Sequence, residues 1–133
     1  MTIPPKPYSF YKKSSSAALA ANQMGAGTIM KLFDLSAMAK FSSTRPHREL
    51  LFDSPNLRVL NFNFEPGQEL PIHSHQADSE VALLVLEGKG VFTGGPEDIP
   101  AHPGVMEIMP VTEPHGLRAT TRLRLLVFIA PTL

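Results

Sequence analysis

The most informative stretch of the sequence reads Gly67-Gln68-Glu69-Leu70-Pro71-Ile72-His73-Ser74-His75. In an extended strand, side chains two residues apart point to the same face, and their Cα atoms lie roughly 6.5 Å apart. The imidazoles of His73 and His75 can therefore converge on one metal ion through metal–nitrogen bonds of about 2.1 Å. Taken alone, a His-x-His pair is weak evidence, because a polar loop after a strand has the same pattern.

A second stretch, residues 104–118, adds a third histidine. A short apolar strand at 105–109 leads into a turn that contains prolines, and His115 begins the strand that follows.

The surrounding sequence has the pattern of β-strands. In residues 57–64, Leu60, Phe62 and Phe64 alternate with Asn61 and Asn63, which predicts a strand with one apolar face. Further apolar runs lie between Gly and Pro residues at 81–86, 90–93, 105–109, 116–120 and 123–129. Short strands at intervals of about ten residues favour an all-β sandwich or barrel over alternating βαβ units.

Residues 67–88 and 104–119 resemble the two motifs of the cupin family. The first motif is matched by Gly67, His73, His75, Glu80 and Gly88, and the second by Gly104, Pro110 and His115. The resemblance covers about residues 50 to 130. It implies a single double-stranded β-helix, also called a jelly-roll barrel, and a metal held by His73, His75, His115 and Glu80. It also implies a homodimer, with exchanged edge strands or arms.

Three positions depart from the cupin pattern. Thr112 stands in place of Gly and resists positive φ, and Ala119 stands in place of Asn. The third departure concerns Glu80, which is followed by seven residues before Gly88, where the family has six. A shift of one residue reverses the facing of a strand, so the inward position falls on Val81. Glu80 then reaches the metal only if a β-bulge absorbs the extra residue, or if the strand begins after it.

The expected ligands favour a divalent transition metal. Imidazoles, with or without one carboxylate, suit Fe, Mn, Ni, Zn, Co or Cu and disfavour Ca or Mg. The chain has no cysteine, which excludes thiolate ligands and disulfides.

The remaining polar residues are expected at the surface. They are His47 and His102 beside prolines, Glu107 in an apolar strand, and Arg122 and Arg124, which alternate with leucines in the last strand.

The pocket around the metal is expected to have mainly apolar walls. Strand alternation predicts a lining of Leu60, Phe62, Phe64, Leu83, Val85, Phe92 and Met109. Such walls favour a small aromatic or hydrophobic ligand over a phosphorylated sugar, and no cluster of Arg and Lys stands out in the barrel strands.

Length and charge exclude several classes of protein. The 133 residues fit one domain, and 12 basic residues balance 12 acidic ones. A neutral chain has no general attraction for phosphate backbones or anionic lipid, so we expect neither nucleic acid nor a membrane as partner. No apolar run approaches the roughly 18 residues that cross a bilayer, and we expect a cytoplasmic protein.

The N-terminal part of the chain differs from the rest. Residues 1–28 contain prolines, a serine run and Gly25-Ala26-Gly27, which predicts a flexible or partner-docked arm before a barrel domain at 29–133. Within that domain, a short helix is expected at 35–41 with Asp34 or Ser36 as N-cap.

Three possibilities remain open from the sequence, since a fold does not fix a function. The first is an oxygenase, isomerase or lyase that acts on a small organic molecule at the metal. The second is a non-catalytic module that binds or senses a small molecule or a metal. A structural role without metal is the third possibility.

Overall fold

The computed structural model describes residues 30–133, which are nearly all strand and loop apart from one short helix. Residues 30–39 and 40–133 belong to separate compact units. In the first unit, the 3₁₀-helix η1 (Leu35–Met38) begins at Asp34, whose side chain accepts a hydrogen bond from the Ser36 N–H at 3.1 Å. The expected helix and its cap are therefore present, but the helix ends at Met38. The arm expected at 1–28 lies outside the described residues and stays a prediction.

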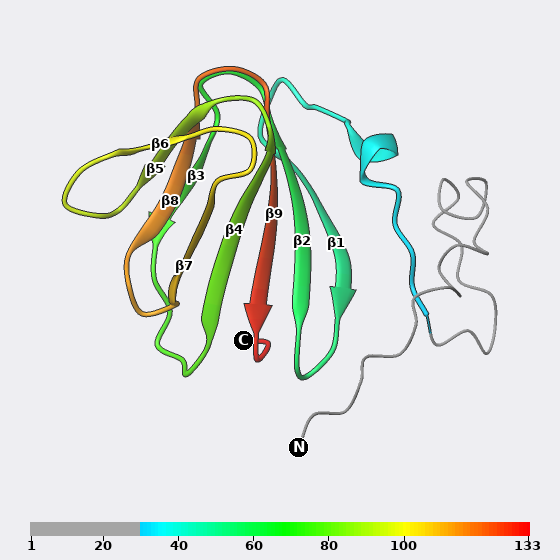
Figure 1. Cartoon of the computed structure of the whole chain (residues 1–133), viewed down its shortest axis with the longest axis vertical. Helices are drawn as coiled ribbons and strands as arrows, with labels where there is room; N and C mark the ends of the chain where they lie inside the picture. The colour runs from blue at the N-terminus through cyan, green and yellow to red at the C-terminus, as the bar shows by residue number, and fades with distance from the viewer. Residues whose placement is uncertain (1–29) are drawn as a thin grey trace. The chain divides into compact units, whose positions relative to one another are not determined.

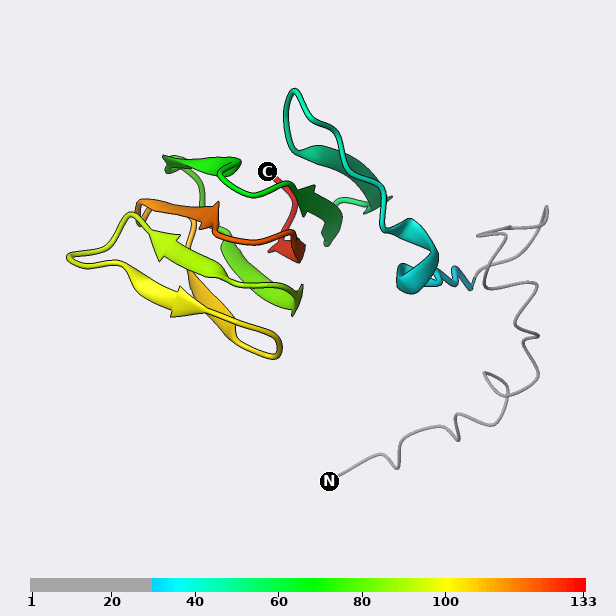
Figure 2. The same ribbon diagram turned by 90° about the horizontal axis from the view of Figure 1, so that it is seen from above.

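The second unit consists of two antiparallel sheets (Figure 1). In chain order, the strands are β1 (His47–Asp53), β2 (Arg58–Phe64), β3 (Glu69–His73), β4 (Glu80–Glu87), β5 (Gly90–Thr93), β6 (Ile99–Ala101), β7 (Met106–Pro110), β8 (His115–Ala119) and β9 (Leu123–Ala130). The larger sheet has the order β1-β2-β9-β4-β7, and the smaller has the order β3-β8-β5-β6. The strands of the smaller sheet follow one another in this order in Figure 2.

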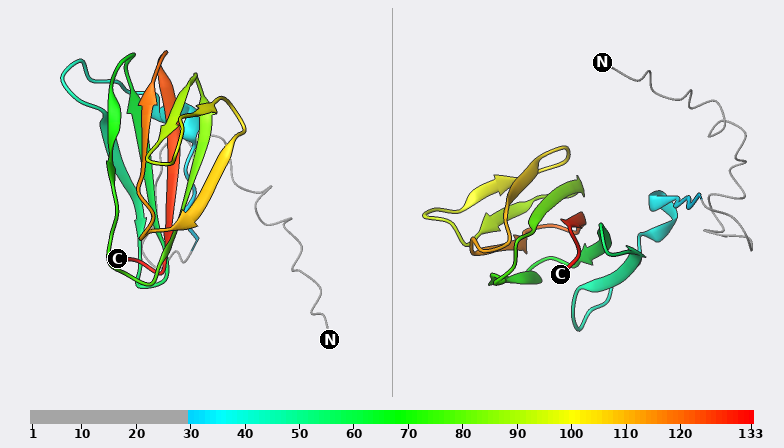
Figure 3. Two further views of the ribbon diagram at one scale, coloured as in Figure 1. Left: turned by 90° about the vertical axis from the view of Figure 1, so that its left-hand side faces the viewer. Right: turned by 90° about the horizontal axis from the view of Figure 1, so that it is seen from below.

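The core lies between the two sheets, which Figure 3 shows from the side and from below. Alternate residues of β2, β4 and β9 point inward, and the register places Phe62 opposite Leu125 and Leu83 opposite Val127. Residues directly opposite in an antiparallel pair share a face of the sheet, so these apolar side chains form one layer. Phe92 and Leu117 of the smaller sheet complete the core. The all-β prediction is confirmed.

The outer face of the larger sheet differs from the expectation. Arg124 was expected in solvent, but it is buried, and its Nε donates to Asn63 Oδ1 at 3.2 Å. Its Nη1 lies 3.5 Å from Glu87 Oε2. Asn63 Nδ2 donates to the carbonyl of Lys40, so a loop covers this face where alternation alone predicted water. Arg122 is exposed as expected.

Asn61 is also fully buried, but its side chain has no hydrogen-bond partner. Neither Nδ2 nor Oδ1 of its side-chain amide forms a hydrogen bond within the part of the chain that the structure describes.

Among residues 30–133 the structure contains no helix that is both long enough and apolar enough to span a membrane.

Gly67 and Gly88 allow a paired test of the turns that enclose the first motif. Both have positive φ, +85° and +84°. A Cβ on Gly67 would meet nothing within 4 Å, whereas one on Gly88 would lie 1.8 Å from the Arg122 carbonyl oxygen. We expect Gly67→Ala to lower the free energy of unfolding by about 1 kcal/mol through backbone strain. Gly88→Ala should lower it by about 4 kcal/mol or more, because backbone must move. Urea unfolding measures both, and equal losses would contradict the close approach at Gly88.

Candidate metal centre and its pocket

His73 and His115 are brought together by the pairing of β3 with β8. The register places the two residues directly opposite each other, at the end of β3 and the start of β8. Their ring centroids are 4.4 Å apart. An irregularity between Leu70 and His73 adjusts the register at this point, as β-bulges often do near functional sites.

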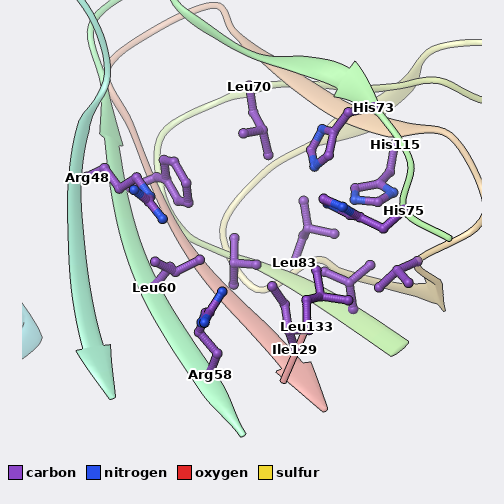
Figure 4. A pocket seen from close by; sticks show the side chains of 14 residues that line it. Arg48, Arg58, Leu60, Leu70, His73, His75, Leu83, His115, Ile129 and Leu133 are labelled. Atoms are coloured by element: carbon purple, nitrogen blue, oxygen red, sulfur yellow. The ribbon is translucent and has the colours of Figure 1, made fainter. Parts of the chain in front are cut away.

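His75 joins them from the loop after β3. Its backbone N–H donates to the Val111 carbonyl at 2.8 Å, which ties this loop to the turn between β7 and β8. Its ring centroid lies 5.1 Å from that of His73 and 6.4 Å from that of His115. Figure 4 shows the three rings gathered on one side of a pocket.

Backbone carbonyls fix which ring nitrogens are free. The Nδ1 atoms of His73 and His115 lie 2.7 Å from the carbonyl oxygens of Pro71 and Glu113. A carbonyl oxygen only accepts, so each Nδ1 carries the hydrogen and donates it. In the neutral form of each ring, the Nε2 atom therefore keeps an unshared electron pair. Metal-binding histidines are oriented by this kind of second hydrogen bond.

The environment of His115 favours the neutral form of its ring. The residue is 3% exposed, and this burial is the main cause that lowers its pKa below 6.5. Repulsion from His73 and His75 lowers the pKa further, while the hydrogen bond to Glu113 opposes the shift. A neutral imidazole is the form that binds a metal ion.

The distances between the rings can be compared with those of a bound site. A metal–nitrogen bond of about 2.1 Å places each ring centroid about 3.2 Å from the ion, so ligand rings lie about 4.5–5.2 Å apart at octahedral or tetrahedral angles. Two of the three separations fit, and the 6.4 Å between His75 and His115 is wider. Accordingly, no completed group of three ligating side chains exists among residues 30–133. The donor set fits a transition metal, and only exposed His75 would have to move.

Glu80 does not join the three histidines. It is exposed, whereas Val81 is buried and lines the pocket. The register from Glu80 to Val85 runs without a bulge, so nothing reverses the facing of Glu80. The structure thus has Val81 at the inward position, and Glu80 on the opposite face of β4.

The pocket beside the histidines has a volume of about 200 Å³. This is below the roughly 300–1,000 Å³ of pockets for drug-sized ligands, so its ligand would be small. Leu60, Phe62 and Leu83 line it as expected, while Phe64, Val85 and Phe92 fill the core behind it. The additional apolar lining residues are Leu70, Val81, Val111, Val127, Ile129 and Leu133.

The walls are mainly apolar, as expected, but Arg48 and Arg58, which the sequence analysis did not place there, also line the pocket (Figure 4). The sequence held a signal for one of them. Arg58 has the same parity in β2 as Leu60 and Phe62, so alternation already places it on the inner face. Arg48 could not be found in this way, because its facing follows from the pairing of β1 with β2.

Glu107 was expected in solvent, yet it is opposite buried Leu83 in the β4–β7 pair. Its Oε1 is buried without a hydrogen-bond partner in the described residues, and burial raises its pKa. Glu107 does not line the pocket.

His47 and His102 lie apart from the three histidines, as expected. His47 pairs with Glu49, and the ring of His102 contacts the Pro103 carbonyl.

Comparisons with known proteins agree with this fold. The Cupin domain family model matches residues 60–129, which is more than half of the chain. An RmlC-like cupin protein from Desulfovibrio desulfuricans is 42% identical, with a TM-score of 0.75; the match covers 78% of this chain and 99% of that one. The protein TT1209 from Thermus thermophilus is 29% identical, with a TM-score of 0.70 and coverage of 77% and 98%.

A more distant likeness bears on the fold alone. The DMSP lyase DddQ from Ruegeria pomeroyi DSS-3 is 24% identical, with a TM-score of 0.59 over 67% of this chain and 48% of that one. The search among curated proteins found no match. The family model, the 42% identical structure and the two-sheet architecture agree, and the chain belongs to the cupin family.

Proposed function

We propose that the protein is a small metal-binding cupin that acts on a small organic molecule. The single observation that carries the proposal is the convergence of three imidazoles, two with Nε2 free, at a pocket with room for a ligand. His73, His75 and His115 would hold one divalent transition metal, namely Fe, Mn, Ni, Zn, Co or Cu. Three protein ligands leave coordination positions open, where a metal supplies Lewis-acid or water-activating chemistry.

The chain's own residues would orient the site. The carbonyls of Pro71 and Glu113 hold the rings of His73 and His115 with Nε2 exposed to the ion. Leu60, Leu83 and Ile129 give the pocket apolar surface and exclude water from the bound ligand. A metal ion that polarises or orients a substrate requires the ligand to lie beside it, as this pocket would allow.

A non-catalytic binding or sensing module is the second candidate. It is favoured by the pocket lining, in which no described residue is Asp or Glu that could serve as a general acid or base. A product screen with metal-loaded protein distinguishes the two candidates, because the module would bind small molecules without converting them.

Replacing His115 tests the metal centre. Wild-type protein loaded with Zn²⁺, Ni²⁺ or Fe²⁺ should retain close to one ion per chain, measured by elemental analysis after desalting. His115→Ala removes one of three ligands and should retain almost none. His102→Ala is the matched control, because His102 is exposed and lies outside the pocket. Full occupancy in the His115 variant would refute the assignment.

Glu80→Gln tests whether the carboxylate belongs to the ligand set. Because Glu80 is exposed on the outer face, we expect the metal dissociation constant to change by no more than about twofold, as for other surface substitutions. Competition with a chromogenic chelator measures it. A loss as large as that of His115→Ala would show that Glu80 is a ligand.

The buried ring of His115 predicts a pH dependence of stability in the metal-free protein. Its pKa is lowered on folding, so the unfolded chain binds more protons just below pH 6.5. The free energy of unfolding should therefore fall as the pH drops from about 7.5 to about 5.5. His115→Gln should flatten this slope, while His102→Gln should preserve it. Urea titrations at each pH supply the measurement, and identical slopes in all three proteins would contradict the prediction.

A further inference from the structure

Two walls of the pocket differ in chemistry. The three histidines occupy one side, and Arg48 and Arg58 occupy the other, with the ends of both guanidinium groups turned toward the hollow (Figure 4). The apolar side chains of Leu60 and Ile129 lie among them on the same lining. A ligand that fills this pocket therefore meets metal-binding groups at one end and cations at the other.

The pairing of the strands places both arginines on the inner face of the larger sheet, where Arg48, on the edge strand β1, is exposed. Arg58 is opposite Ile129 in the β2–β9 pair, and Arg48 is opposite Phe62 in the β1–β2 pair. Ile129 and Phe62 both line the pocket, and directly opposite residues share a face. Each guanidinium group thus extends from a strand position and not from a free loop.

The two arginines differ in their partners. Arg58 uses Nε and Nη2 to bind the two carboxylate oxygens of Asp53, at 3.2 and 3.3 Å. Its Nη1 has no partner among residues 30–133. The exposed side chain of Arg48 forms no hydrogen bond or ion pair with any residue in the same part of the chain. Asp53 itself does not line the pocket.

The charges of the pocket indicate its ligand. One of the two positive charges is matched by Asp53, which leaves one net charge for a ligand. That balance suits a monoanion better than a phosphate dianion. A planar guanidinium group binds a carboxylate through two parallel hydrogen bonds, and the apolar surface accepts the remainder of the molecule.

We propose that this pocket binds a small carboxylate, whose carboxylate group is held by Arg48 and the free Nη1 of Arg58 while its other end faces His73, His75 and His115. This choice of substrate class rests on the proposed function, because it assumes that this pocket is where the ligand binds. Arg48 and Arg58 are then specificity-determining residues. The Arg58–Asp53 pair keeps one guanidinium group in place before the ligand arrives.

The experiment uses hexanoate, a monoanion with a short apolar chain, and its neutral counterpart hexanamide. Binding to metal-free protein is measured by NMR titration, so that the metal cannot attract the carboxylate. Hexanoate should bind more tightly than hexanamide. Arg48→Met should weaken hexanoate at least about tenfold, because a charge-assisted hydrogen bond is lost, and should leave hexanamide unchanged. Arg45→Met is the matched control, since Arg45 is exposed like Arg48 and carries the same charge but does not line this pocket.

The outcomes separate this inference from the metal assignment. Failure of hexanoate to bind, equal binding of hexanoate and hexanamide, or equal effects of the two arginine variants would overturn it. Tighter binding of inorganic phosphate than of hexanoate would overturn the choice of a carboxylate. A protein that binds hexanoate through Arg48 but retains no metal would support the inference while refuting the metal centre. A protein that retains the metal but does not bind hexanoate through Arg48 would refute the inference and leave the metal centre intact.

Discussion

The antiparallel register of β3 against β8 is the constraint on which the site depends. It places His73 opposite His115 and turns both rings toward the pocket that lies beside the core. A slip of one residue would turn one of these rings to solvent and leave an inner position without an imidazole. The apolar alternation of β2, β4 and β9 therefore supports more than stability, since it fixes the sheet against which β3 and β8 are placed.

The fold and the three histidines could be predicted because they rest on local patterns. Period-two alternation identified the strands, and two spaced motifs identified His73, His75 and His115 as a group. The inward position of Val81 in place of Glu80 could also be derived, by counting back from Gly88 in steps of a strand. What counting could not decide was whether a bulge would restore Glu80, because a bulge depends on the neighbouring strands.

Sequence reasoning missed Arg48 and misplaced Arg124 and Glu107, because the positions of these residues depend on contacts between distant parts of the chain. Arg48 faces the pocket because β1 pairs with β2, and Arg124 is buried because the loop at Lys40 covers the outer face. Glu107 interrupts a run of apolar residues, and alternation alone allowed it to lie on either face of the sheet. Because it is opposite Leu83, it lies on the inner face. Arg124 and Glu107 were expected in solvent from alternation within their own strands, and no expectation was made for Arg48. Alternation within one strand does not show which other elements cover each of its faces.

Asn61 has a practical consequence for anyone who wishes to use this barrel as a scaffold. Its amide is fully buried with both polar atoms unsatisfied within the described residues, which costs about 1–3 kcal/mol relative to a satisfied group. The residue lies on the face of β2 that is turned away from the cavity, since Leu60 and Phe62 on either side of it line the cavity. An apolar replacement of similar shape is thus expected to raise the free energy of unfolding without changing the residues that line the pocket. Thermostability engineering of this chain can begin at that single position.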